Sequence, residues 1–230
     1  MDQDALVILD FDALLFGFRE WFCEVLQVTD LERLHAIRNV STSNYRDHVS
    51  AFQRECDTAA PTIQDRLNRF FASIVVPRYG PIANRQPAPT FRSHFAVSDS
   101  DLLEESRDFG LLEPSTFLKR HYFDNYRPGV FHRDKDYGLI NGTVNLWLPV
   151  TDVYGTNTLW IGDRNRGGRD AMPIHLHYGQ CLFFDGAHRW HGAVWNCSPT
   201  TRISFDIRFI PSKHLPGTPV ASNDRDGGVT

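Results

Sequence analysis

Residues 202–209 read RISFDIRF, a stretch in which polar and apolar side chains alternate without a break. Successive side chains of a β-strand point to opposite faces of the sheet. One face carries four large hydrophobic residues: Ile203, Phe205, Ile207 and Phe209. The other face carries four hydrophilic residues: Arg202, Ser204, Asp206 and Arg208. Because unpaired charges are costly inside a protein, the stretch predicts a strand that separates a hydrophobic core from a hydrated cavity or an anion site.

The first third of the chain is expected to cover the apolar face of this strand. Apolar residues recur near a helical period over 13–26, and those of 63–74 recur at i, i+4, i+7, i+8 and i+11. Both segments are therefore predicted to be amphipathic helices, the second ending before Pro77. The composition of NRQPAP, at 84–89, indicates a turn or linker.

From about residue 90 the pattern changes to short strands separated by turn residues. Besides 202–209, four stretches have this character: FRSHFAV (91–97), TVNLWLPV (143–150), NTLWIG (157–162) and QCLFFDG (180–186). The fold class predicted is mainly β with N-terminal helices. We expect one compact domain, with a helical layer at 1–89, a β core at 90–211 and a flexible polar tail at 212–230.

Composition and charge exclude several classes of protein. The chain has 230 residues and a formal net charge of -4, so a nucleic-acid or anionic-membrane surface is not expected. The N-terminus is acidic and does not resemble a signal peptide, and no apolar run reaches bilayer length. The four cysteines are dispersed, which is typical of reduced thiols in a cytoplasmic protein. The sequence leaves the oligomeric state undetermined.

A second stretch, GVFHRDKDYG at 129–138, has the spacing of metal ligands. In a strand, His132 and Asp134 share one face, so an imidazole nitrogen and a carboxylate oxygen can converge on one ion. The segment 185–196 offers His188 or His191 as a third ligand. We favour His191, because the small Gly192 follows it and fits a strand entering a cavity. Two histidines and one carboxylate with open positions form the facial triad of non-haem Fe(II) oxygenases.

Three short motifs carry a family resemblance. HRD (132–134), HG (191–192) and RIS (202–204) resemble the HxD…H…RxS pattern of Fe(II)/2-oxoglutarate-dependent oxygenases. Over roughly residues 90–211 the chain resembles the phytanoyl-CoA dioxygenase-like branch, and small natural-product biosynthetic oxygenases of the streptomycin-pathway type. The resemblance implies a double-stranded β-helix (jelly-roll, cupin-like) core.

The same resemblance implies residue roles and a reaction. His132, Asp134 and His191 would bind Fe(II), while Arg202, assisted by Ser204, would bind the distal carboxylate of the co-substrate 2-oxoglutarate. With O2, the enzyme would oxidise an aliphatic C–H bond, by default to the alcohol, with desaturation or ring closure such as cyclopropanation as alternatives. Halogenation is not expected, because the carboxylate ligand is present. The small-molecule substrate predicted is a free amino acid or a natural-product intermediate.

Other polar residues are candidates for the same cavity. In TVNLWLPV, Asn145 is predicted to hydrogen-bond the co-substrate and Trp147 to form a wall of the pocket. Arg92, Arg208 and Arg127 are predicted to receive a carboxylate of the substrate. In an alternative interpretation, Arg202 and Arg208 form interior ion pairs with Asp206.

Three further alternatives were considered. The HLH stretch at 175–177 resembles a cupin metal pair, but no glutamate follows nearby, so a solvated pair is preferred. VILDFDALL, at 7–15, resembles the nucleophile motif of haloacid-dehalogenase phosphatases, but Leu14 stands where that motif has Thr or Val. Asp12 is instead predicted to cap a helix. Finally, a β-barrel that binds a small anion without chemistry would use the same arginine-rich face.

Overall fold

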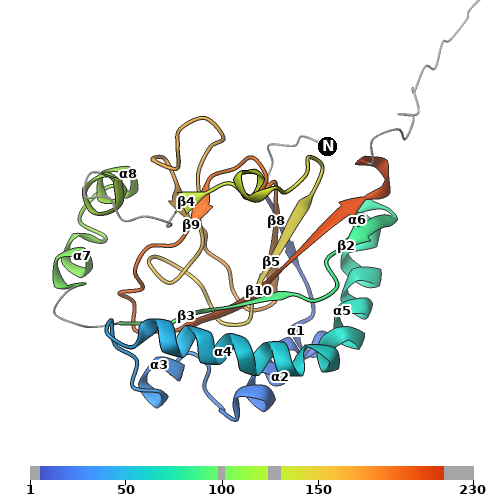
Figure 1. Ribbon diagram of the computed structural model, residues 1–230, viewed down its shortest axis with the longest axis horizontal. Helices are drawn as coiled ribbons and strands as arrows, with labels where there is room; N and C mark the ends of the chain where they lie inside the picture. The colour runs from blue at the N-terminus through green and yellow to red at the C-terminus, as the bar shows by residue number, and fades with distance from the viewer. Residues whose placement is uncertain (1–5, 98–101, 124–130, 215–230) are drawn as a thin grey trace, which may run out of the picture.

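The computed structural model describes residues 6–97, 102–123 and 131–214 (Figure 1). The strands are β1 (Val7–Asp10), β2 (Ile82–Arg85), β3 (Thr90–His94), β4 (Phe131–His132), β5 (Val144–Pro149), β6 (Trp160–Ile161), β7 (Met172–Pro173), β8 (Gln180–Phe184), β9 (His191–Gly192) and β10 (Arg202–Pro211). The α-helices are α1 (Ala13–Phe16), α2 (Phe18–Leu26), α3 (Leu34–Ile37), α4 (Tyr45–Ala59), α5 (Gln64–Phe70), α6 (Val76–Tyr79), α7 (Leu103–Asp108) and α8 (Pro114–Leu118). The 3₁₀ and π segments are η1 (Ala60–Ile63), η2 (Phe71–Val75), η4 (Lys119–Phe123), η5 (Asp134–Tyr137) and η6 (Ser212–His214).

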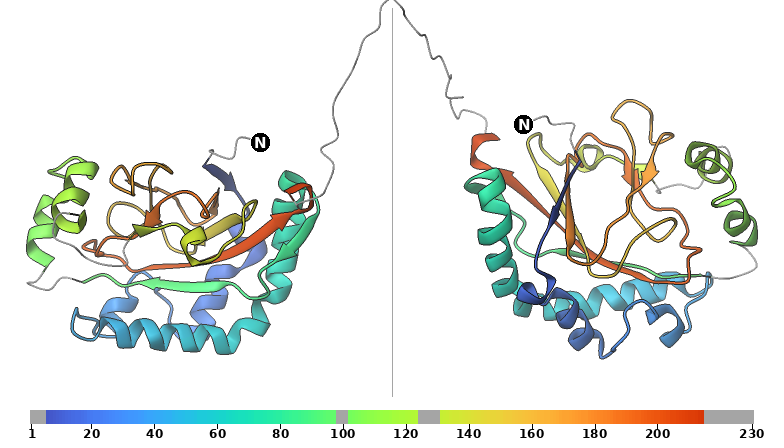
Figure 2. Two further views of the ribbon diagram at one scale, coloured as in Figure 1. Left: turned by 45° about the horizontal axis from the view of Figure 1, so that its top comes forward. Right: turned by 180° about the vertical axis from the view of Figure 1, so that it is seen from behind.

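The strands form two antiparallel sheets. The larger has the order β1-β8-β5-β10-β2, with β3 also paired to β10, and the smaller has the order β4-β9-β6-β7. The N-terminal helices lie along one face of the larger sheet, and the smaller sheet lies across its other face (Figures 1 and 2). The mainly β architecture with N-terminal helices is therefore confirmed.

Strand β10 separates two interiors, as its alternating sequence predicted. Its apolar side chains join the core beneath α2, α4 and α5, where the ring of Phe205 lies 5.1 Å from that of Phe18. The side chains of the neighbouring strand β5 alternate in the same way. On β5, Leu146 and Leu148 face the helices, while Trp147 faces the smaller sheet. The cavity between the two sheets is therefore lined by the polar face of β10.

Replacing Phe205 with alanine is expected to lower the free energy of unfolding by about 3–5 kcal/mol, because the side chain is fully buried among aromatic rings. Phe205→Leu, which conserves most of the volume, is expected to cost less than about 1.5 kcal/mol. Urea unfolding of both variants measures the difference. Leu111→Ala, at a side chain 79% exposed, is the control, and an equal loss there would contradict the buried position of Phe205.

The predicted N-terminal helix is present but broken. Gly17 has a left-handed backbone (φ 58°), which ends α1 and begins α2. The predicted cap is confirmed, since Asp12 Oδ1 accepts hydrogen bonds from the backbone N–H groups of Leu14 and Leu15. Asp12 thus has a structural role at the start of a helix, and Asp10 is exposed and bonded to Gln180.

The predicted end of the second helix before Pro77 is wrong. The helical path continues through η2 and α6 and ends at Gly80, whose φ is 77°. The wider π-helical turn of η2 ends at Val75, two residues before the proline. A proline inside a regular helix lacks an N–H donor and clashes with the carbonyl four residues earlier, and a π-helical turn relieves both constraints.

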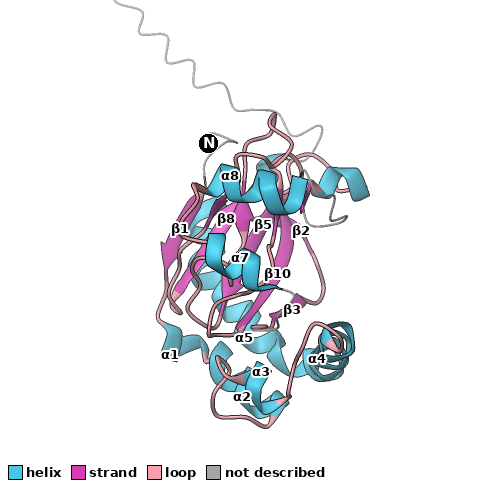
Figure 3. Ribbon diagram, turned by 90° about the vertical axis from the view of Figure 1, so that its left-hand side faces the viewer, coloured by secondary structure: helices cyan, strands magenta, loops and turns pink. Residues whose placement is uncertain are grey.

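Several elements were not predicted. Helix α4 is mostly polar and buries only Phe52 and Cys56, so its apolar stripe is weak. β2 occupies the start of the segment expected to be a linker, where β10 supplies its hydrogen bonds. Helices α7 and α8 interrupt the expected β core and cover the end of the smaller sheet (Figure 3). No helix within the described ranges combines the length and the apolar character needed to cross a bilayer.

Candidate metal centre

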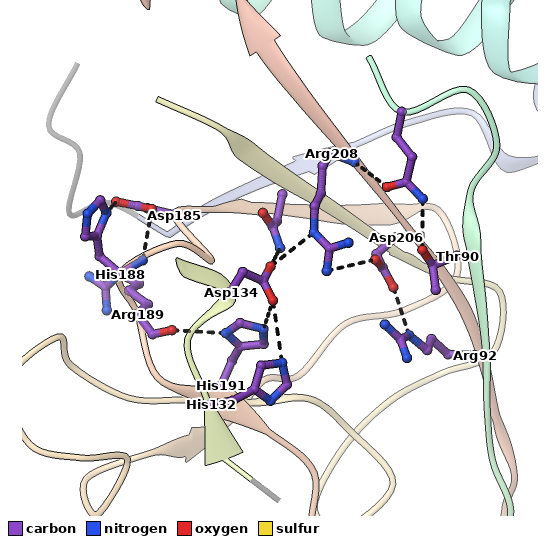
Figure 4. A network of polar contacts seen from close by, with 12 residues as sticks. Thr90, Arg92, His132, Asp134, Asp185, His188, Arg189, His191, Asp206 and Arg208 are labelled. Carbon is purple, nitrogen blue, oxygen red and sulfur yellow. Dashed lines mark hydrogen bonds and ion pairs between the residues drawn. The ribbon is translucent and has the colours of Figure 1, made fainter. Parts of the chain in front are cut away.

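The two histidines meet because two distant segments pair as strands. β4 and β9 are antiparallel, and in their register His132 lies opposite His191. Directly opposed residues of an antiparallel pair place their side chains on the same face of the sheet. The ring centroids are 4.5 Å apart, and both side chains point into the space between the sheets (Figure 4).

Asp134 reaches the same point from outside the strand. The expectation that it lies in one strand with His132 is wrong, because β4 ends at His132 and Asp134 begins the 3₁₀ turn η5. The extended conformation of Arg133 (φ -118°, ψ 138°) still turns both side chains to one side. Asp134 Oδ1 lies 3.5 Å from His132 Nε2 and 3.5 Å from His191 Nε2.

The orientation of His191 fits it for a metal. Its Nδ1 lies 3.0 Å from the carbonyl oxygen of Arg189, so Nδ1 carries the proton and Nε2 presents a lone pair to the site. His188 is directed elsewhere, with its Nδ1 2.8 Å from Asp185 Oδ2. Among the described residues, His132, Asp134 and His191 form the group whose ligand atoms lie close enough together to hold a metal ion, and His188 is not part of it.

The second oxygen of Asp134 is occupied by the protein. Oδ2 accepts hydrogen bonds from Asn145 Nδ2 at 2.7 Å and from Arg208 Nε at 3.1 Å. Burial alone would raise the pKa of Asp134, but the neighbouring imidazoles of His132 and His191 and the hydrogen bond from Asn145 outweigh burial and hold the pKa well below its usual range. The carboxylate is therefore charged at neutral pH, as a metal ligand must be. Asn145, predicted to contact a co-substrate, contacts the metal ligand.

A buried cation lies at one end of the cavity. Arg202 is 7% exposed, and its Nε and Nη1 have no hydrogen-bond partner among the described residues. Burial lowers its pKa to about 10, so the guanidinium remains charged at neutral pH. It lies 5.7 Å from the ring centroid of Trp147, and the buried Ser204 Oγ is likewise unpartnered within the described part of the chain. Arg202 thus forms no ion pair with Asp206, and its charge is available to an anion.

The other two described arginines of the cavity are already paired. Arg92 Nε lies 3.1 Å from Asp206 Oδ1, and Arg208 Nη2 lies 3.8 Å from Asp206 Oδ2 (Figure 4). For Arg208 the alternative of an interior ion pair is therefore borne out. Asp206 Oδ2 accepts no hydrogen bond within the described chain, although the residue is only 8% exposed. Asp206 Oδ2 is therefore a buried acceptor without a hydrogen-bond donor at this wall of the cavity.

Most of these side chains border one cavity of about 180 Å³, although Asp134 and Ser204 do not line it. Most of the predicted site residues line it: Arg92, His132, Asn145, Trp147, His191, Arg202 and Arg208. The predicted residue Arg127 lies outside the described residues. Sequence reasoning missed the lining contributed by Leu159, Phe184 and Ala193, since single apolar residues carry no chemical signal. The preferred interpretation of the HLH stretch is confirmed, because His175 and His177 are both exposed.

The donor set fits a divalent metal ion. Adjacent ligands at about 2.1 Å from an octahedral ion lie about 3 Å apart, close to the observed 3.5 Å separations. The cavity that His132 and His191 line is also bordered by Arg202 and Trp147. The fold is thus that of a β-sheet protein in which two histidines and one carboxylate could hold a metal ion.

Comparison with known proteins shows the family to which the chain belongs. It is 32% identical over 190 residues to the streptomycin biosynthesis protein StrG of Streptomyces griseus, a match that covers 82% of this chain and 76% of StrG. The chain belongs to the same family as StrG, and the predicted resemblance to natural-product proteins of the streptomycin-pathway type is confirmed.

Solved structures with similar chains were also found. A nickel complex of the non-haem monooxygenase ThoJ matches over 91% of this chain and 74% of its own, at 18% identity and a TM-score of 0.45. The non-haem alpha-ketoglutarate-dependent carbocyclase SnoK from nogalamycin biosynthesis matches over 40% of this chain and 51% of its own, at 17% identity and a TM-score of 0.29. No family model matches the chain.

Proposed function

We propose that this protein is a non-haem Fe(II)- and 2-oxoglutarate-dependent oxygenase that oxidises an aliphatic C–H bond of a small polar substrate, with hydroxylation as the default outcome. One observation carries the proposal: the two histidines of a triad of metal-ligand geometry line the same cavity as a buried arginine that has no ion-pair partner among the described residues. A site that only bound a metal would have no use for the second feature.

Each group of residues in the site has a separate proposed role. His132, Asp134 and His191 would hold Fe(II), and Arg202 would form a bidentate contact with the distal carboxylate of 2-oxoglutarate, assisted by the Ser204 hydroxyl. An unpaired guanidinium in a dry cavity is costly, and a dicarboxylate removes that cost. When bound, Fe(II) and the co-substrate would supply O2 activation, so that R–H, 2-oxoglutarate and O2 give R–OH, succinate and CO2.

The size of the cavity supports a compact substrate. A volume of about 180 Å³ corresponds to about six water molecules at roughly 30 Å³ each, which one small dicarboxylate would largely fill. A second cavity of about 410 Å³ also borders Arg208, although none of the three triad residues lines it. Its volume is within the usual range for small-molecule sites.

The chemistry of the wall favours a substrate with hydrogen-bond donors. Arg92 and Arg208 are paired with carboxylates, while Asp206 Oδ2 has no hydrogen-bond donor within the described chain. We therefore propose that the substrate presents a hydroxyl or amine here, as free amino acids and many natural-product intermediates do. The name of StrG, a biosynthesis protein of an antibiotic, supports the second of these classes.

We also propose that strands β3 to β10 form a double-stranded β-helix core (90–211), and that the N-terminal layer (1–89), which adds β1 and β2 to the larger sheet, is fixed to it as part of one domain. Two facing antiparallel sheets with the metal ligands between them support this architecture. The first residues of the proposed flexible tail (212–230) form η6, and those from 215 onward lie outside the described residues.

The decisive experiment measures succinate release from 2-oxoglutarate with Fe(II), O2 and ascorbate across a panel of amino acids and natural-product intermediates. We expect succinate to form in step with one substrate class, and omission of Fe(II) to abolish it. Product mass separates the outcomes, since hydroxylation adds one oxygen while desaturation or ring closure removes two hydrogens. A protein that binds neither metal nor 2-oxoglutarate and releases no succinate would instead be a non-catalytic anion-binding β-barrel.

A further inference from the structure

Gly186 lies against the side chain that holds the candidate metal ligand. A Cβ atom at this position would be 2.4 Å from Asn145 Nδ2, 2.7 Å from its Cγ and 2.9 Å from its Oδ1. All three distances are shorter than Cβ contacts in folded proteins. The backbone of Gly186 is outside the left-handed region, so space and not backbone conformation demands glycine here.

The same turn also holds the backbone of the metal ligand. The carbonyl oxygen of Gly186 accepts a hydrogen bond of 2.8 Å from the N–H of Asp134, and that of Ala187 accepts one of 3.3 Å from Lys135. Gly186 follows β8, which pairs with β5 so that Phe184 lies opposite Asn145. The turn at Gly186 therefore positions Asp134 in two ways: it bonds the main-chain N–H of Asp134, and it leaves room for the Asn145 amide that bonds the carboxylate.

Asp134 is held so that its two oxygens differ. Oδ2 accepts from both Asn145 Nδ2 (2.7 Å) and Arg208 Nε (3.1 Å), and a carboxylate oxygen has two lone-pair sites. Oδ1 faces His132 and His191. Asn145 and Arg208 lie opposite each other on β5 and β10, so three adjacent strands of the larger sheet build this arrangement.

We propose that Gly186 and Asn145 are positioning residues that restrict Asp134 to binding the metal through Oδ1 alone. This inference rests on the proposed metal site and names how that site is kept open. A carboxylate that bound through both oxygens would occupy one of the positions that the co-substrate and O2 require. Gly186 acts through Asn145, because only the missing Cβ lets the amide reach Oδ2.

The test uses Co(II) as the probe and the full-length protein. Gly186→Ala and Asn145→Ala are each expected to weaken Co(II) binding about 10–100-fold in calorimetric titration, the usual effect of losing an outer contact to a ligand. The visible absorption spectrum of the Co(II)-loaded protein, which reports coordination, should change in both variants. Asn68→Ala, an exposed helical asparagine, is the matched control and should bind Co(II) as the wild type does.

The double variant Gly186→Ala/Asn145→Ala distinguishes positioning from a general packing defect. If both residues act through one contact, the double variant should bind Co(II) no more weakly than either single variant, because the alanine at 145 leaves room for the new Cβ. Thermal unfolding checks that each variant is folded, and Asn145→Ala carries the test alone if Gly186→Ala does not fold.

Two results would overturn the inference. Single variants that bind Co(II) with wild-type affinity and spectrum would show that Asn145 does not orient Asp134, and additive losses in the double variant would show that Gly186 does not act through it. A wild-type protein that binds no Co(II) would instead overturn the proposed metal site itself, and this inference with it.

Discussion

Asp134→Ala is expected to abolish both metal binding and turnover. The substitution removes the anionic ligand from a site otherwise built of two imidazoles, and it leaves Asn145 and Arg208 without their shared acceptor. Losing an outer contact to a metal ligand costs about 10–100-fold in affinity, and losing the ligand itself should cost more. Titration with Fe(II) under anaerobic conditions, followed by a succinate assay, measures both effects.

The chain offers a matched control two residues away. Asp136 is also an aspartate of η5, but it is exposed and pairs with Arg133 on the surface. Asp136→Ala should therefore retain metal binding and succinate release. His191→Ala should behave as Asp134→Ala does. Full activity in either His191→Ala or Asp134→Ala would break the assignment of the triad.

Arg202→Leu is expected to raise the KM for 2-oxoglutarate by about 100-fold, with a much smaller effect on metal affinity. A hydrogen bond to a charged group contributes about 1.5–3 kcal/mol, and 1.4 kcal/mol corresponds to tenfold in affinity, so loss of a bidentate pair has an effect of this size. The KM of Arg202→Lys for 2-oxoglutarate should lie between that of the wild type and that of Arg202→Leu, because lysine keeps the positive charge but lacks the planar guanidinium fork. Steady-state succinate release at varied 2-oxoglutarate measures the change.

Loss of folding should not complicate this measurement. The guanidinium is buried with no partner for its Nε or Nη1 in the described chain, so the shorter, apolar leucine removes an unfavourable burial of charge. Arg166→Leu, at an exposed loop position, controls for the loss of a positive charge. An unchanged requirement for 2-oxoglutarate in Arg202→Leu would mean that another residue binds the co-substrate.

The parts of the site that could be read from the sequence are those with a short, chemically specific spacing. His132 and Asp134 are two residues apart, and Arg202 and Ser204 share one face of an alternating strand. In both pairs a local extended backbone is enough to place the two side chains on one side. This explains why the pairs were predicted even though Asp134 begins a turn outside β4.

The contacts that hold these ligands depend on pairings distant in sequence. Asn145 and Arg208 meet Asp134 because β5 and β10 are neighbours in the larger sheet, and Gly186 reaches the site because β8 lies beside β5. No single segment contains this information. Arginines predicted to receive a substrate carboxylate are paired with Asp206 and Asp134 for the same reason, since a charge finds its partner only when the strands assemble.

The amino-acid order alone was sufficient to predict the two faces of β10 and the mainly β architecture with a helical layer, and to select the three candidate ligands that the fold brings together. These features follow from periodicity and ligand chemistry, which act over a few residues. Strand pairing in three dimensions was needed to learn which oxygen of Asp134 accepts the hydrogen bonds of Asn145 and Arg208. It was also needed to learn which arginine of the cavity has no ion-pair partner among the described residues and why glycine fits position 186. Each of these depends on the distance between side chains from different strands, and that distance is set by the packing of the whole sheet.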